Sequence, residues 1–168
     1  MLIRGIKFPL VVYMYNTLKE IAEEVLYRLN AYSDDALVLV MRTGAAESGY
    51  RALRGKGDKN PAVGFWQVEP ATAIDVWDNF VLYRPFYRQV LYSLGYDDSN
   101  PEFSILSNIA LQVAFCRLQY LRDPEQIPDW TDINKQAQYW KRIYNTELGR
   151  GTVKHFIQEA GSLDVRFN

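Results

Sequence analysis

The apolar positions of the chain recur at helical spacing through most of its length. In residues 17–30 they fall three and four positions apart, which predicts an amphipathic helix. In residues 37–41 they are continuous, which predicts a helix over residues 36–47 that is buried on all sides. Asp34 or Asp35 can cap this second helix.

A buried strand is the alternative interpretation of residues 37–41, because that run is rich in β-branched side chains. Ala45 and Ala46 follow the run and favour the helix. Gly49 is suited to end it, since helices often stop at a glycine.

Prolines and glycines divide the remainder of the chain into short elements. Residues 49–63 are polar and contain several glycines, which predicts an irregular loop. We expect a mainly α fold with a single domain over residues 1–168, of which residues 1–33 form the N-terminal helical part. The further helices expected cover residues 70–80, 85–94, 101–121 and 133–144, followed by one that Thr152 caps and that ends before Gly161.

Residues 1–15 superficially resemble a signal peptide, because Arg4 and Lys7 precede a short apolar stretch. That stretch contains Pro9, and no small-x-small cleavage site follows it before Lys19. We therefore expect the segment to be the start of the fold and no signal peptide. No apolar run approaches the length of a membrane span.

Composition narrows the chemistry that the chain can perform. The net charge of −1 comes without a basic run, which argues against a nucleic-acid partner. Cys116, in an apolar run, is the only cysteine and His155 the only histidine, so we expect a buried, inert thiol and no metal site or cofactor. The 12 Tyr, 8 Phe and 4 Trp exceed what a core needs and suit a cleft that binds rings or sugars.

Glu47 is the first candidate for chemistry, within the segment Gly-Ala-Ala-Glu-Ser-Gly-Tyr. It stands at the C-terminal end of the apolar helix, where desolvation and the negative end of the helix dipole both favour the protonated carboxyl. A glycosidase acid needs that form near neutral pH. The alternative is an ordinary solvated carboxylate at a helix end.

Two further segments carry polar groups next to aromatic rings. In residues 64–72, Gln67 can bind a sugar hydroxyl or N-acetyl group, and Phe65 or Trp66 can cover a ring face. In residues 139–146 a helix ends in Tyr-Asn before a glycine-rich turn. The alternative reading places the aromatic residues in the core and gives Gln67 and the asparagine capping roles.

The order and spacing of these segments resemble the soluble lytic transglycosylase and goose-type lysozyme family. The family pattern is Glu-Ser, then Gly-Leu-Met-Gln-x-x-Pro-x-Thr, then Ala-Tyr-Asn-Ala-Gly. Ser107-Asn108-Ile109 is similar to the family's Asn-Ile helix motif, although Gln112 stands where the family has glycine. The resemblance covers residues 37–156 and is nearest to small tailed-bacteriophage proteins that carry this domain.

The resemblance implies a lysozyme-like helical domain whose cleft binds the glycan strands of peptidoglycan. Glu47 would protonate the oxygen between N-acetylmuramic acid and N-acetylglucosamine, then act as the base that closes a 1,6-anhydro ring. Tyr144 would orient Glu47 or the substrate, and no metal or cofactor is implied. The substrate-binding candidates are Ser48, Tyr50, Phe65, Trp66, Gln67, Tyr144 and Asn145.

A second carboxylate would change the reaction from transglycosylation to hydrolysis. Inverting glycosidases place it about 6.5–9.5 Å from the acid, with a water between the two groups. Asp58, in the polar loop, and Glu69 are the candidates. A solvated Asp58 and a Glu69 that interacts with a helix N-terminus are the alternatives, so both reactions stay open.

A non-catalytic role is the alternative from another class. A phage virion or tail protein could retain the fold to bind the cell wall, because fold alone does not establish function. Without an export signal, the resemblance implies a protein in the virion, among tail proteins, or an endolysin in the host cytoplasm. Either location requires delivery to the periplasm or cell wall.

Overall fold

The computed structural model describes residues 7–51, 53–55 and 61–167, and in them the protein is mainly helical, as predicted. The only β pairing in these ranges consists of isolated bridges of Val63 with Arg54 and Val68. None of the helices described there is long and apolar enough to cross a membrane. The helical elements are α1 (Lys7–Arg28), α2 (Asp34–Ser48), α3 (Pro70–Val76), the π-helical turn η1 (Trp77–Val81), α4 (Pro85–Ser93), α5 (Pro101–Ser107), α6 (Ile109–Leu121), α7 (Ile133–Trp140), the π-helical turn η2 (Lys141–Asn145) and α8 (Val153–Phe167).

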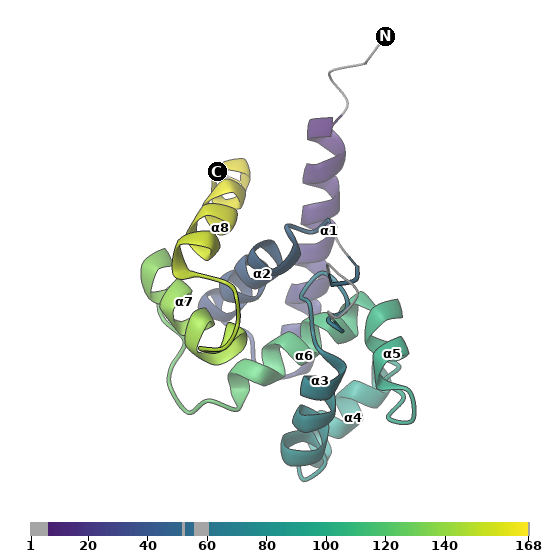
Figure 1. The fold of residues 1–168 in the computed structure, drawn as a ribbon. Coiled ribbons are helices and arrows are strands. Elements are labelled where there is room, and N and C mark those ends of the chain that lie inside the picture. Colours follow the sequence, from purple (N-terminus) through teal and green to yellow (C-terminus); the bar gives the residue numbers. More distant parts are fainter. Residues whose placement is uncertain (1–6, 52, 56–60, 168) are drawn as a thin grey trace.

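The helices form two groups around α6, which runs through the middle of the molecule (Figure 1). On one side α2, α7 and α8 pack against one another. On the other side lie α3, α4 and α5, and α1 packs along α6 and α2. The loop before α3 and the loop between η2 and α8 therefore face each other across the end of α2.

The apolar run of residues 37–41 is helical and not a strand, and its side chains are almost all buried. Ser33 caps α2, with its hydroxyl oxygen accepting from the Ala36 N–H at 3.0 Å. The expectation that Asp34 or Asp35 would be the cap is wrong by one residue, and both carboxylates lie instead in the first turn, where the helix dipole favours them. Gly49 ends the helix in the left-handed conformation, as predicted.

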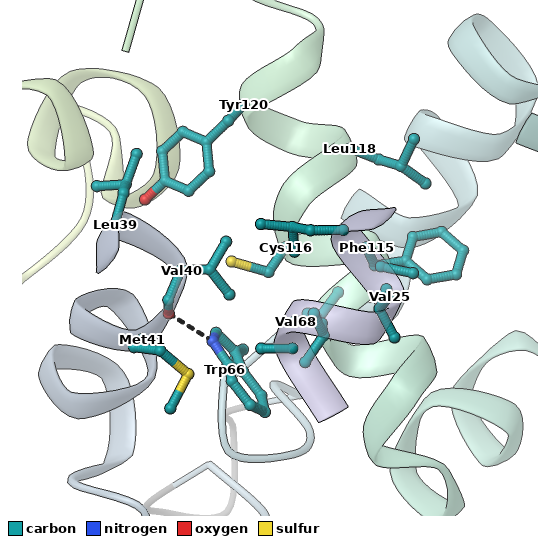
Figure 2. Close-up of a cluster of buried hydrophobic side chains, with 14 of the residues drawn as sticks. Val25, Leu39, Val40, Met41, Trp66, Val68, Phe115, Cys116, Leu118 and Tyr120 are labelled. Atoms are coloured by element: carbon teal, nitrogen blue, oxygen red, sulfur yellow. Dashed lines mark hydrogen bonds between the residues drawn. The ribbon is translucent and has the colours of Figure 1, made fainter. Parts of the chain in front are cut away.

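The core forms where α1, α2 and α6 meet the turn that precedes α3 (Figure 2). Trp66 is completely buried there, and its indole nitrogen donates to the Val40 carbonyl at 2.7 Å. Phe115 and Cys116 of α6 are also completely buried. Burial raises the pKa of the Cys116 thiol well above its usual range, which agrees with the expectation of an inert cysteine.

The predicted helix over residues 101–121 is interrupted at Asn108. The backbone of Asn108 is extended, and its side-chain oxygen accepts from the Leu111 N–H at 3.2 Å, which caps α6. Its amide nitrogen donates to the Leu94 carbonyl at 2.7 Å. Asparagine competes for backbone groups in this way, so it separates α5 from α6 where apolar periodicity alone predicts continuity.

Two helices extend beyond their predicted ends. The first begins at Lys7, because Pro9 falls in the first turn, where its missing N–H costs no helical bond. The last begins after Thr152 as expected but continues through Gly161 to Phe167. A glycine within a helix costs only about 1 kcal/mol, and the burial of Leu163 one half-turn later offsets it.

Gln112 is a buried polar residue of α6 that ties this helix to the turn before α3. Its buried side chain accepts from the Phe65 N–H at 2.9 Å and donates to the Ile105 carbonyl at 3.0 Å. It fills the space over Gly64, where a Cβ atom would lie 2.3 Å from the Gln112 amide carbon. Gln112 therefore holds the turn over residues 64–68 against α6.

We predict that Gln112→Ala lowers the free energy of unfolding by about 2–4 kcal/mol, because two buried backbone groups lose their partners. Urea unfolding of the variant and the wild type measures the difference. Gln138→Ala, at an exposed position of α7, is the matched control and should change stability by less than about 0.5 kcal/mol. Equal stability of the two variants would contradict a structural role for the Gln112 amide.

Candidate active site

A cleft of about 920 Å³ opens at the C-terminal end of α2. One side comes from the loop before α3 and the first turn of that helix, and the other from η2, the loop after it and the start of α8. The lining residues are Ala46, Glu47, Pro61, Ala62, Gln67, Val68, Glu69, Thr72, Gln119, Trp140, Tyr144, Asn145, Thr146, Leu148, Gly149, Arg150, Gly151 and His155.

Glu47 occupies the last turn of α2, with its carboxyl group partly buried in the cleft wall. Burial raises the pKa of Glu47 from 4.5 to about 7, a hydrogen bond from Trp140 opposes the rise, and the charge of Glu69 adds to it. A carboxyl group with this pKa is largely protonated just below neutral pH. It can therefore donate a proton to an oxygen atom bound in the cleft.

The turn over residues 64–68 lies directly behind the cleft and is held by two of the predicted site residues. The Ser48 hydroxyl donates to the Phe65 carbonyl at 2.7 Å. The Tyr144 hydroxyl donates to the Trp66 carbonyl at 2.6 Å. The segment that contains Glu47 and Ser48 and the segment that contains Tyr144 and Asn145 thus both bind the backbone of this turn.

Gln67 lines the cleft, and its backbone adopts a left-handed conformation with φ of 49°. Its side-chain nitrogen donates to the Gly64 carbonyl at 2.8 Å, so the side chain also closes the turn. Asn145 lines the cleft too, and its side-chain oxygen accepts from the Lys141 ammonium at 2.8 Å. Tyr144, Gln67 and Asn145 therefore line the same cleft as Glu47.

Four predicted substrate-binding residues do not line the cleft. Trp66 is in the core, and Tyr50 is buried with its hydroxyl donating to the Met41 carbonyl at 2.6 Å. Phe65 is partly buried and packs edge-on against Tyr50. Ser48 faces the Phe65 carbonyl instead of the cleft. In each case the aromatic or hydroxyl group satisfies the packing and hydrogen bonding of the turn, which sequence cannot distinguish from ligand binding.

Of the two candidates for a second carboxylate, Glu69 is among the described residues and Asp58 is not. Glu69 lies in the cleft lining at an exposed position, immediately before α3, and its charge acts on Glu47. Its side chain makes no capping hydrogen bond to α3, which it precedes. Asp58 lies outside the described residues. Glu69 is therefore the carboxylate that the cleft presents together with Glu47.

Several residues that line the cleft were not assigned to the site from sequence, among them Trp140, His155 and Gln119. Trp140 contacts Glu47 directly, with its indole nitrogen 3.0 Å from Glu47 Oε1. His155 of α8 has its ring Nε2 2.8 Å from the Ala46 carbonyl oxygen. Gln119 of α6 also lines the cleft. Trp140 precedes Tyr144 by four residues, a spacing that places both side chains on one face of a helix. This spacing was the sequence signal that could have assigned Trp140 to the site.

A metal ion in a protein is usually bound by several His, Cys, Asp or Glu side chains that lie close together. Among residues 7–51, 53–55 and 61–167 no group of three or more His, Cys, Asp or Glu side chains lies close enough together to hold a metal ion. The acidic side chains in the described lining of the cleft are Glu47 and Glu69, and His155 lies in the same lining.

We predict that Glu47→Gln stabilises the protein increasingly as pH rises. The folded wild type binds more protons at Glu47 than the unfolded chain between pH 4.5 and about 7, so its stability falls as pH rises through that window. Glutamine avoids this loss, and its advantage should grow by about 2–3 kcal/mol from pH 4 to pH 8. Urea unfolding at several pH values measures it.

The control for charge alone is Glu20→Gln, at an exposed position of α1, which contributes no residue to the cleft. Its stability relative to the wild type should not show this growth with pH. A Glu47→Gln advantage that stays constant from pH 4 to pH 8 would show that the Glu47 carboxyl is not desolvated.

No family model, no curated protein and no solved structure matches this chain. The family resemblance therefore depends on the motifs in the sequence.

Proposed function

We propose that this protein cleaves the glycan strands of peptidoglycan, with Glu47 as the general acid, in a lysozyme-like domain. The observation that carries the proposal is the partly buried Glu47 carboxyl in the wall of an open cleft, with a pKa raised to about 7. A carboxyl of this kind protonates the leaving oxygen of a glycosidic bond near neutral pH.

The arrangement of the three motif segments supports the proposal. Tyr144 and Ser48 bind successive carbonyl groups of the turn that carries Gln67. The turn thereby stays next to the helix end that presents Glu47. The three segments whose order and spacing resemble those of the lytic transglycosylase and goose-type lysozyme family thus contribute to one cleft.

In the proposed reaction, the substrate is the β-1,4 bond between N-acetylmuramic acid and N-acetylglucosamine. Glu47 donates its proton to the bridging oxygen as the bond to the sugar carbon breaks. On the transglycosylation route the resulting Glu47 carboxylate then removes the proton from the muramoyl C6 hydroxyl group as that oxygen bonds to the sugar carbon. Gln67 and Asn145 line the cleft, and in this proposal their amide groups bind sugar hydroxyl or N-acetyl groups.

The attacking hydroxyl belongs either to the muramoyl C6 position or to water. The first route gives a 1,6-anhydro sugar and needs only Glu47. The second, with inversion, needs a carboxylate that activates water, and Glu69 is the described residue in a position to supply it. Mass spectrometry of the fragments distinguishes the routes, since hydrolysis leaves reducing ends.

We predict that Glu47→Gln lowers the rate of peptidoglycan lysis at least 100-fold, because general acid catalysis contributes a factor of about 10²–10⁴. Glutamine retains an oxygen that accepts the Trp140 hydrogen bond, so the variant should keep the wild-type fold. Loss of turbidity of purified peptidoglycan measures the rate.

Glu20→Gln is the matched control, and it should lyse peptidoglycan at the wild-type rate. Comparable lysis by Glu47→Gln and the wild type would remove Glu47 from the mechanism. Binding of the wild type to peptidoglycan with no fragments released from pH 4 to pH 9 would favour the non-catalytic wall-binding role instead. Glu69→Gln then separates the two routes, because only the hydrolytic one requires that carboxylate.

A further inference from the structure

One carboxyl oxygen of Glu47 is bound and the other is left for the cleft. The Trp140 indole nitrogen lies 3.0 Å from Glu47 Oε1. Among the described residues no side chain or backbone group makes a hydrogen bond to Oε2. The two oxygens of the candidate acid are therefore not equivalent.

The chemistry of the indole favours one position for the proton of the neutral carboxyl. An indole N–H group can only donate a hydrogen bond, so Oε1 accepts it in both the neutral and the ionised carboxyl. The carbonyl oxygen of a neutral carboxyl is a better acceptor than its hydroxyl oxygen, so this bond favours the proton on Oε2. From this geometry we propose that Trp140 is a positioning residue that directs the transferable proton of Glu47 to the oxygen facing the cleft. The inference rests on the proposed function of Glu47 as an acid.

The surroundings of Trp140 keep its ring in this position. The ring is buried, and it packs against Phe156 with 5.1 Å between ring centroids. On another side a Cβ atom at Gly151 would lie 2.5 Å from the ring edge, so only glycine allows the loop to approach so closely. The indole therefore has no room to turn away from Glu47.

The next residue fixes the loop that covers the ring. The Lys141 ammonium donates to the Asn145 side-chain oxygen and to the carbonyls of Thr146 and Gly149, each at 2.8 Å. These bonds hold the loop between η2 and α8 against the end of α7. Trp140, its covering loop and Glu47 are thus joined by direct contacts in the cleft wall.

A buried indole usually finds a hydrogen-bond partner for stability alone, and Trp66 is an example in the same molecule. Trp66 is as deeply buried as Trp140, and its indole nitrogen donates to the Val40 carbonyl at 2.7 Å. The two residues differ in the acceptor, because a backbone carbonyl does not titrate and the Glu47 carboxyl does. Trp66 is therefore an internal control for Trp140.

The positioning role predicts a change in the pH dependence of lysis. The bond to Trp140 favours the ionised carboxyl and lowers the pKa of Glu47, against the larger effect of burial. The other ionisable groups that face Glu47 or share its cleft wall remain when the indole N–H is removed. They are Cys116 and Tyr120 of α6, Glu69 before α3, Tyr144 of η2, Arg150 of the loop and His155 of α8.

We predict that Trp140→Phe moves the alkaline limb of the pH–rate profile to higher pH by about one pH unit. It should also lower kcat about 10-fold with little change in KM, because the proton is no longer directed to one oxygen. Trp66→Phe, which removes a buried indole N–H bonded to a carbonyl, should leave the limb at its wild-type position. A limb that does not move in Trp140→Phe would overturn the inference.

A second measurement uses the wild-type protein and requires neither activity nor a folded variant of Trp140. The indole N–H signals are followed by ¹H–¹⁵N NMR from pH 4 to pH 9, with Trp140 assigned by elimination using Trp66→Phe, Trp77→Phe and Trp130→Phe. The Trp140 signal should shift with a midpoint near 7, and the shift should vanish in Glu47→Gln.

The Trp66 signal should show no such transition. A Trp140 signal that does not move over this range, or that still moves in Glu47→Gln, would overturn the inference even if the protein lyses peptidoglycan. Conversely, a titrating Trp140 signal without any lysis would contradict the proposed function and leave the contact itself established.

Discussion

The backbone of the turn over residues 64–68 is the constraint on which the cleft depends. Ser48 from α2 and Tyr144 from η2 bind its successive carbonyl groups, and Gln112 from α6 accepts from the Phe65 N–H. Buried peptide groups must be paired, so these bonds fix the separation of the three segments as well as the shape of the turn. Because Glu47 precedes Ser48, and Trp140 lies about one turn before Tyr144, the same bonds bring the carboxyl and the indole to one wall.

Opposing electrostatic effects then set the state of Glu47. Burial of the carboxyl disfavours its charge, the negative Glu69 acts in the same direction, and the Trp140 hydrogen bond acts against both. Burial is the largest of the three, which keeps the acid protonated to about pH 7. A carboxyl in bulk water could not serve as a proton donor there, whereas a carboxyl buried without a donor would be slow to release its proton.

Apolar periodicity and helix-ending residues were sufficient to predict the helical class, the course of α2 and its end at Gly49. They failed at Asn108, whose side chain competes for backbone groups, and at Gly161, where packing by Leu163 overrides a weak local preference.

At the site, sequence identified Glu47, Gln67, Tyr144 and Asn145 as cleft residues. It could not separate ligand binding from turn packing for Tyr50 and Trp66, because that difference depends on which neighbours bury each ring. Nor could it find the contact of Trp140 with Glu47, which joins residues 93 positions apart.

The ionisation of Glu47 can be measured directly. With ¹³C-labelled glutamate, the carboxyl signal of Glu47 is assigned by its absence in Glu47→Gln and followed from pH 3 to pH 9. A midpoint near 7 is expected, because the folded protein desolvates this carboxyl group. A midpoint near 4.5, the ordinary value for glutamate, would contradict the assignment of Glu47 as an acid that operates near neutral pH.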